Sequence, residues 1–179
     1  MTTPARTERL TFRCWTPADL VRATSLWCDP EVMRFMGGPY TREEVAARLA
    51  REIANLEERG IQYWPLFSGD EFIGCCGLKP NPDDASQLEL GFHLLPAYWG
   101  RGFGAESARA VIAYAFDLVG ADAIYAGHHP HNEASRALLT RLGFEQIGAH
   151  LFPRTGLDHP WYRLTRSRTF AASPAASSG

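Results

Sequence analysis

The sequence predicts an α+β fold in which about four helices flank one mixed, mostly antiparallel sheet of about seven strands. Three observations predict it. Strand and helix signals follow one another in the order β-α-α-β-β-β-α-β-α-β-β. Hairpin signals join the early strands, whereas one glycine-rich turn and helix provide the crossover that a parallel pair of strands needs. The 179 residues suit one domain with one core.

The first element is a strand, and a helix follows it. Arg9–Trp15 alternates between polar and apolar residues, as a half-buried strand does. Thr16 is an N-cap residue in front of Pro17. A helix is therefore expected from there to about Cys28, where an Asp-Pro pair breaks it.

A capping box begins the second helix. Thr41 and Glu44 have the spacing at which each side chain caps the backbone N–H of the other. The helix should end near Gly60. Its apolar residues recur at helical spacing and form one stripe: Val45, Leu49, Ile53 and Leu56.

Two strands joined by a hairpin follow this helix. Tyr63–Phe67 and Glu71–Leu78 are rich in apolar residues, and Ser68, Gly69 and Asp70 between them are turn formers. Pro65 cannot donate a ladder hydrogen bond, so the first of these strands is expected at an edge or beside a bulge.

The second half of the chain alternates between strands and helices. Asn132 is an N-cap for its last helix, which Gly143 ends. The expected elements are strands at Leu88–Leu95, Ala123–Gly127, Phe144–Ala149 and His159–Thr165, with helices at Phe103–Val119 and Glu133–Leu142.

The two ends of the chain differ in composition from the rest. Residues 1–8 are expected to form a loose arm, residues 9–166 a single domain, and the small-residue-rich tail 167–179 to be disordered. The net charge of −2, with both signs interspersed, argues against a nucleic-acid-binding surface. The N-terminus lacks the apolar core of a signal peptide, and no apolar run is long enough to span a membrane, so cytoplasmic residence is expected.

The four cysteines favour reduced core thiols over a metal site. Their spacing matches no zinc pattern, and the adjacent Cys75 and Cys76 should point to opposite faces of a strand. His128, His129 and His131 lie at the end of a strand, where Pro130 forces a turn. Because metal ligands are usually fixed on regular elements, no metal is predicted, and one or two of these histidines are expected to border the acceptor site.

The glycine-rich turn after Leu88–Leu95 predicts a site for a phosphate-bearing cofactor. Helix starts expose backbone N–H groups and the positive end of the helix dipole. Gly100, Gly102 and Gly104 let that backbone approach an anion closely. A dinucleotide fold would place such glycines after an early strand with a different spacing, so the position here argues against NAD.

The same residues resemble landmarks of the GNAT superfamily. Residues 98–106, YWGRGFGAE, resemble its acetyl-CoA pyrophosphate loop, although Trp99 departs from the usual Gln or Arg. Asn132 and Ser135, followed by Leu142-Gly143-Phe144, resemble its Asn-x-x-Ser and Leu-Gly-Phe landmarks. The resemblance covers about Arg9 to Arg166 and is strongest to the ribosomal-protein N-terminal acetyltransferases.

The resemblance implies a sheet that is splayed at its central parallel strand pair, with a bulge near Gly91. The pantetheine arm of acetyl-CoA would lie in the splay and pair with the backbone of β-strand residues as an added strand does. Asn132 would also bind it. The residues expected to bind the cofactor are Phe92, His93, Leu94, Gly100, Arg101, Gly102, Phe103, Gly104, Ala105 and Asn132.

The implied reaction is direct transfer of an acetyl group from acetyl-CoA to a primary amine. Glu89 is the candidate base, acting through a water, and the alternative is that it is an ordinary strand carboxylate. Leu139 occupies the position at which other members carry an acidic tyrosine, so Ser135, near the thioester sulfur, or a water would have to serve. The sequence does not identify the general acid.

The sequence leaves the acceptor and the assembly open. The amine could belong to a protein N-terminus, which needs an open groove between the Trp15–Tyr40 segment and the C-terminal hairpin, or to a small molecule, which needs a closed pocket. A non-catalytic acyl-CoA-binding sensor is the alternative function. The protein is expected to be a monomer or homodimer that binds neither nucleic acid nor membrane.

Overall fold

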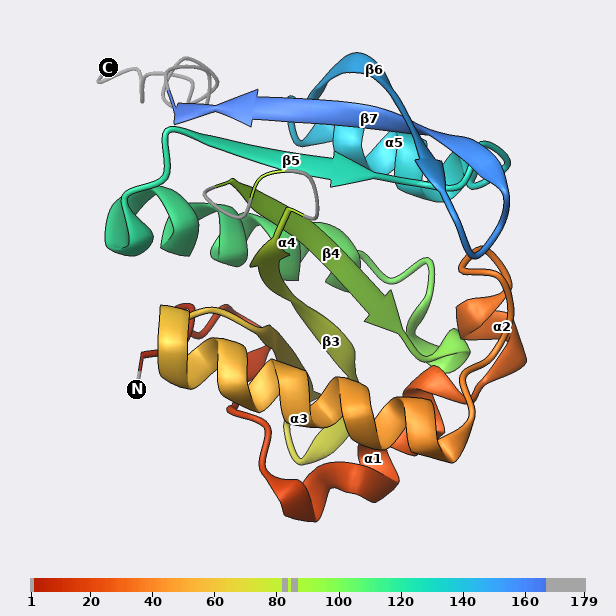
Figure 1. The fold of residues 1–179 in the computed structure, drawn as a ribbon. Coiled ribbons are helices and arrows are strands. Elements are labelled where there is room, and N and C mark those ends of the chain that lie inside the picture. Colours follow the sequence, from red (N-terminus) through yellow and green to blue (C-terminus); the bar gives the residue numbers. More distant parts are fainter. Residues whose placement is uncertain (1, 82–83, 85–86, 167–179) are drawn as a thin grey trace.

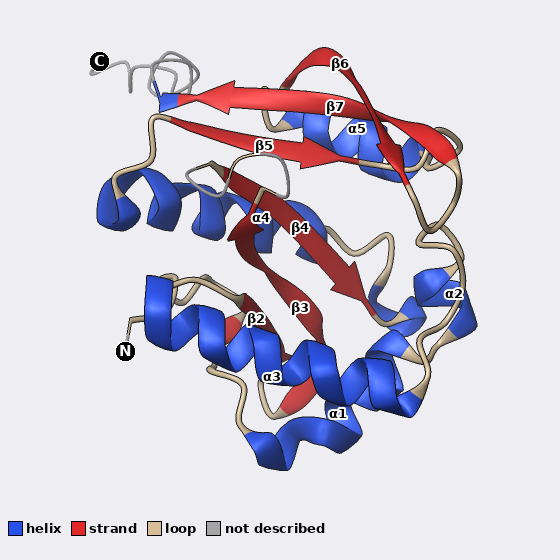
Figure 2. Ribbon diagram, in the orientation of Figure 1, coloured by secondary structure: helices blue, strands red, loops and turns tan. Residues whose placement is uncertain are grey.

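The computed structural model describes residues 2–81, 84 and 87–166. It has the predicted α+β architecture, a mixed sheet with helices on both faces (Figures 1 and 2). The strands of the described residues are β1 (Thr11–Phe12), β2 (Tyr63–Ser68), β3 (Glu71–Pro80), β4 (Leu88–Leu94), β5 (Ala123–Gly127), β6 (Glu145–Phe152) and β7 (Leu157–Thr165). The α-helices are α1 (Leu20–Trp27), α2 (Pro30–Met33), α3 (Arg42–Arg59), α4 (Phe103–Tyr114) and α5 (Glu133–Arg141).

The sheet has the order β1-β2-β3-β4-β5-β7-β6, and its β4–β5 pair is parallel. The N-terminal half of the chain forms one side of that pair and the C-terminal half forms the other. β4 and β5 pair only at Leu88↔Ile124 and Glu89↔Tyr125, after which they diverge. The expected splay is therefore present, and it opens beyond Glu89.

The splay does not come from the expected bulge near Gly91. The β3–β4 register is unbroken along the whole of β4, so that prediction is wrong. Gly91 has another function, because a Cβ there would lie 1.9 Å from the hydroxyl oxygen of Tyr63. The glycine makes room for a side chain from β2.

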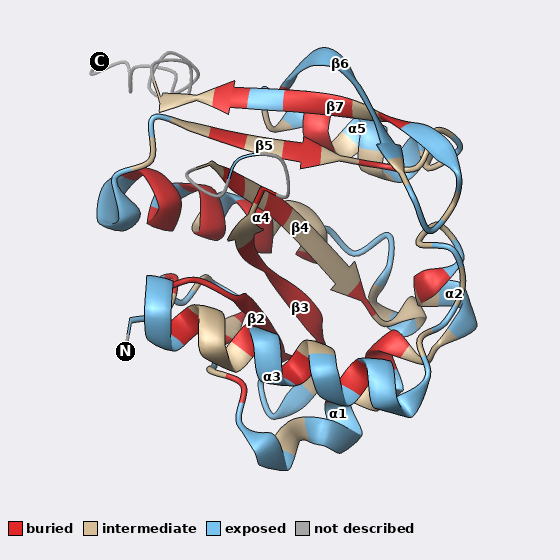
Figure 3. Cartoon of the chain, viewed as in Figure 1, coloured by how far each residue is buried: buried red, intermediate tan, exposed pale blue. Residues whose placement is uncertain are grey.

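Two cores lie on the two faces of the sheet. On one, called here the α4 face, α4 and α5 pack on Trp64, Leu78 and Leu90. On the other, the α3 face, α1 and α3 pack on Tyr63 and Cys75. Figure 3 shows these buried layers and, in contrast, the exposed edge strand β6.

Several local predictions hold. Thr41 and Glu44 form the capping box of α3, and Asn132 caps α5 by accepting from the N–H of Ser135. Strand β5 has the expected bounds. The helix that starts at Phe103 continues through a π-helical turn to Val119.

Others needed correction. The first strand shrinks from Arg9–Trp15 to two residues. Asp29-Pro30 ends α1 but also begins α2, because the Asp29 carboxylate accepts from the N–H groups of Glu31 and Val32. Proline at the first helical position needs no donor there, so the same pair breaks one helix and starts the next.

The N-terminal segment contacts the start of α4. Within the arm expected at residues 1–8, the Thr7 hydroxyl donates to Glu106, and the tail 167–179 lies outside the described residues.

Cys75 and Cys76 are both fully buried and unbridged, and burial raises the pKa of the Cys76 thiol to about 12. In the described part of the chain no helix is long and apolar enough to cross a membrane.

Candidate active site

The site is built around the glycine turn, residues 99–105, which joins β4 to α4. Gly100 and Gly102 have φ angles of +71° and +82°, which side chains rarely adopt. Gly102 is the N-cap residue of α4 and has no side chain to satisfy the N–H groups of the first turn. Those groups and the helix dipole fit a diphosphate, and a Cβ on Gly100 would meet no atom within 4 Å.

The third glycine serves packing. A Cβ on Gly104 would lie 3.4 Å from Leu138 of α5 and 3.8 Å from Leu94 of β4. Gly104 thus lets the start of α4 approach both sides of the splay. Arg101 is exposed, with its guanidinium 5.2 Å from the Phe103 ring centre. It can add a charge-assisted contact to a phosphate.

Trp99 anchors the turn to the end of β4. Its indole N–H donates to the carbonyl of Leu94 at 2.7 Å. Of the three β4 residues expected to pair with pantetheine, Leu94 therefore has its carbonyl already occupied. Phe92 and His93 both lie beyond the last β4–β5 pair, but successive strand residues direct their backbone groups to opposite neighbours. Since the Leu95 N–H donates to the Ile73 carbonyl of β3, the backbone groups of His93 face β3 and those of Phe92 face the splay.

A cluster at the N-terminus of α4, which sequence reasoning missed, holds the other end of the glycine turn. The Glu106 carboxylate accepts from the Thr7 hydroxyl at 2.5 Å, the Arg9 backbone N–H at 3.0 Å and the Arg9 Nε at 2.7 Å. Arg9 then donates from Nη1 to the Arg101 carbonyl at 3.0 Å and lies 4.5 Å from the Phe103 ring centre. Burial alone would raise the pKa of Glu106, but these hydrogen bonds lower it.

Glu89 lies where the parallel pair ends. Its Oε1 is 3.0 Å from Nζ of Lys79, the residue opposite it on β3. Burial raises the pKa of Glu89, and the Lys79 cation opposes that rise. Glu89 is thus a mostly buried carboxylate with a single close cation, at the edge of the splay.

The two residues predicted to be catalytic lie on opposite faces of the sheet. Glu89 shares the α3 face with Tyr63 and His93, whereas Ser135 belongs to α5 on the other face. Leu139 is almost fully buried in the core of the α4 face.

Ring side chains continue the α3 face across β5 and β7. Tyr125, opposite Glu89, stacks on Trp161 at 6.4 Å between centroids, and Trp161 contacts His150 at 4.8 Å. Gly127 makes room for the Trp161 ring, since a Cβ there would lie 2.7 Å from it. The near-parallel rings of Tyr125 and Trp161, with the tilted His150 ring against them, form a wall on the same face as the Glu89 carboxylate.

His128 and His129 lie on different faces of the sheet. His129 contacts Phe35 at 5.1 Å and His159 at 5.4 Å, whereas the buried His128 lies 3.1 Å from the Tyr162 hydroxyl on the other face. Burial, together with the nearby histidines, lowers the pKa of His159 to about 4. In the described ranges, no group of three His, Cys, Asp or Glu side chains is arranged to hold a metal.

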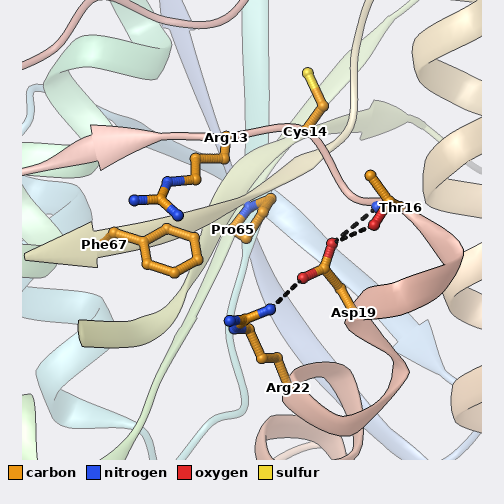
Figure 4. Close-up of a pocket in the computed structure, with 7 residues that line it drawn as sticks. All are labelled: Arg13, Cys14, Thr16, Asp19, Arg22, Pro65 and Phe67. Carbon is orange, nitrogen blue, oxygen red and sulfur yellow. Dashed lines mark hydrogen bonds and ion pairs between the residues drawn. The ribbon is translucent and has the colours of Figure 1, made fainter. Parts of the chain in front are cut away.

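A separate hollow of about 220 Å³ lies beside β1 and β2 (Figure 4). Within it, the Asp19 carboxylate bonds to Thr16 and Arg22. Its lining contains none of the predicted site residues and consists of Arg13, Cys14, Thr16, Asp19, Arg22, Pro65 and Phe67. We assign it no part in the site.

Comparisons with known proteins agree with this geometry. The family profile described as "Acetyltransferase (GNAT) domain" matches residues 9–145. An uncharacterized N-acetyltransferase p20 of Bacillus licheniformis is 32% identical over 146 residues, covering 79% of this chain and 82% of that protein. The FsC-acetyl coenzyme A-N(2)-transacetylase of Aspergillus fumigatus is 31% identical over 174 residues, covering 80% of this chain and 74% of that protein.

The fold is shared with solved structures. An acetyltransferase from Agrobacterium tumefaciens superposes with a TM-score of 0.79 at 28% identity. The match covers 93% of this chain and 96% of that one.

Proposed function

The chain belongs to the GNAT acetyltransferase family and is an acetyl-CoA-dependent N-acetyltransferase, and we propose that its acceptor is a small-molecule primary amine which Glu89 deprotonates. When bound, acetyl-CoA supplies the acetyl group as a thioester. The N–H groups at Gly102–Ala105 hold its diphosphate, and Asn132 and the open backbone at Phe92 orient its pantetheine arm.

Glu89 is the proposed base because it is the last β4 residue paired with β5. Its carboxylate therefore lies at the apex of the splay, next to the point at which an amine and the bound thioester meet. Its raised pKa improves it as a base, while the Lys79 contact fixes its orientation. A backbone N–H near His93 stabilises the negative charge that develops on the acetyl oxygen.

The assignment to a small-molecule acceptor rests on one observation, the Arg154 bridge. Here this name means the contacts between the β6–β7 turn (residues 153–156) and residues 37–44. Arg154 donates to Glu44 at 3.0 Å and to the Pro39 carbonyl at 3.1 Å, and lies 4.3 Å from the Tyr40 ring centre. A Cβ on Gly37 would lie 2.6 Å from the Arg154 carbonyl oxygen, so the backbones approach closely.

The bridge occupies the groove that a peptide acceptor needs. That groove would run between the helical segment before Tyr40 and the C-terminal hairpin, which Figure 1 shows meeting beside α2. Phe35 adds a second contact across it, to His129. What remains beside the splay is the Glu89 carboxylate and the rings of Tyr125 and Trp161, which suit a compact amine with an apolar body. The relative from Aspergillus fumigatus is named an N(2)-transacetylase, which supports a nitrogen acceptor.

Acceptor competition tests the proposal. The ratio of kcat/KM for phenethylamine to kcat/KM for a peptide N-terminus should exceed about ten in the wild-type protein, which corresponds to about 1.4 kcal/mol. Arg154→Ala should open the groove and raise kcat/KM for the peptide. Arg51→Ala is the matched control, because Arg51 and Arg154 both line a hollow between α3 and the β6–β7 turn. A wild-type preference for the peptide, or an unchanged ratio in Arg154→Ala, would refute it.

Three finer assignments rest on the sequence. We propose a position near the ribosomal-protein N-terminal acetyltransferase branch from the landmarks at residues 98–106 and 132–144. This resemblance implies a protein substrate, whereas the Arg154 bridge favours a small-molecule acceptor. Cytoplasmic residence, supported by the free cysteines, and a monomeric or homodimeric state are further proposals.

A further inference from the structure

Tyr63 reaches the splay across two glycines. Tyr63 of β2, Gly77 of β3 and Gly91 of β4 are in register across three neighbouring strands. Gly91 would carry a Cβ only 1.9 Å from the Tyr63 hydroxyl oxygen and 2.5 Å from its Cζ. The ring therefore lies over the position where the Gly91 side chain would be. Its hydroxyl ends at β4, just beyond the last β4–β5 pair.

The backbone of Tyr63 is held from both sides. Its N–H donates to Oε2 of Glu52 at 2.8 Å, and its carbonyl accepts from the indole N–H of Trp15 at 2.5 Å. The Arg48 guanidinium, 3.6 Å from Glu52, lies 5.4 Å from the Tyr63 ring centre. The Glu52 carboxylate thus fixes the Tyr63 backbone, and the Arg48 cation beside it lies among the rings of Trp27, Tyr40 and Tyr63.

The Tyr63 hydroxyl lies on the same face as two residues of the proposed site. Gly91 is two residues from Glu89 and two from His93, and both side chains share the face of Tyr63. Burial, followed by the Glu89 charge, raises the pKa of Tyr63 well above its ordinary value, so the phenol keeps its proton at neutral pH. His93 cannot replace it, because burial lowers the pKa of its imidazolium well below the usual value.

We propose that Tyr63 is the general acid of this enzyme and protonates the departing thiolate of coenzyme A. As the amine nitrogen bonds to the acetyl carbon, the carbon–sulfur bond breaks and its electron pair goes to sulfur, which takes the phenolic proton. Glu89, having accepted a proton from the amine, returns one to the phenolate through water. The products are the acetamide and the free thiol, with each group back in its starting form.

This inference rests on the proposed function only in using Glu89 as the base. The resemblance implies a proton-donating tyrosine at the position of Leu139, which is apolar and buried in the core of the α4 face. A general acid at Tyr63 explains why none is needed there. The hydroxyl comes instead from β2, through a path that the paired glycines leave free.

Tyr63→Phe tests the proposal, because it keeps the ring and removes the hydroxyl. With acetyl-CoA and phenethylamine, kcat should fall about 100-fold, while the Kd of CoA stays within about twofold. With 4-nitrothiophenyl acetate as donor, whose thiolate needs no proton to leave, the loss should be below about threefold. Gly91→Ala, which displaces the hydroxyl without removing it, should reproduce both results.

Tyr114→Phe is the control. It removes another buried hydroxyl, which donates to the Gly60 carbonyl at 2.7 Å on the other face, and should change the stability but not the ratio of the two donor rates. Equal losses with both donors in Tyr63→Phe, or no loss with either, would overturn the assignment. The comparison of the two donors uses the same amine throughout, so it reports only how the sulfur departs. If the proposed acceptor class were wrong, the ratio of kcat/KM for the amine to kcat/KM for the peptide would show it instead.

Discussion

Arg9 should control the affinity for coenzyme A without touching the acceptor site. Arg9→Ala removes the hydrogen bond to the Arg101 carbonyl and frees Glu106 from its cation. Residues 100 and 102 then lose one of the contacts that hold their left-handed conformations. We expect the glycine turn to become mobile in the free enzyme, so that binding must order it again.

The size of the effect follows from the contacts. A hydrogen bond from a charged donor contributes about 1.5–3 kcal/mol. The Arg9 side chain is 43% exposed, so water replaces part of this, and about 1–2 kcal/mol remains. The Kd of CoA should therefore rise about five- to thirtyfold. Glu106→Gln keeps the shape and loses the charge, so its effect should be smaller.

Isothermal titration calorimetry with CoA measures this effect, and Arg6→Ala, an exposed arginine nearby, is the matched control. kcat at saturating acetyl-CoA should stay within about twofold, since the contact serves binding. A Kd within twofold of wild type in Arg9→Ala, with a lowered Tm, would show that the cluster stabilises the fold and does not position the turn.

Two predictions concern pH. Lys79→Met removes the cation that holds down the pKa of Glu89, so the acidic limb of the kcat/KM profile should move to higher pH. Glu89→Gln should abolish that limb. If the limb did not move in Lys79→Met, Glu89 would be excluded as its source. The neutral form of His159 is favoured in the fold, with a pKa of about 4 against 6.5. The stabilisation that this gives the folded state is therefore complete above pH 6.5 and is lost as the pH falls towards 4. Urea unfolding should show this loss in wild type and a flatter dependence in His159→Gln, and parallel curves would contradict it.

Helix caps and turns could be predicted from the sequence, because each depends on residues that are close together in the chain. The capping residues Thr41 and Asn132 satisfy donors three residues away, so their helix starts could be read from the sequence. The glycine turn was equally readable, because positive φ angles at a helix start demand glycine. Asp29 shows the limit, since one motif both ends and begins a helix and only tertiary packing decides whether the next turn forms.

The parts of the site that were missed are non-local. Glu106 meets Arg9 across 97 positions, and Arg154 meets Glu44 across 110. No periodicity or spacing encodes such pairs, because they depend on how the strands are ordered. Gly91 was recognised as special but given the wrong reason, since its partner, Tyr63, comes from a strand two places away in the sheet.

The central claim is that backbone amides at the start of α4 grip the diphosphate of coenzyme A. Amide NMR during titration tests it most directly. CoA should shift the N–H resonances of Gly100, Gly102 and Gly104 at a stoichiometry of one, and pantetheine, which lacks the diphosphate, should leave those three signals in place while moving those of β4. If CoA bound with full affinity and left the three glycine signals unmoved, the diphosphate would lie elsewhere and the site described above would be wrong.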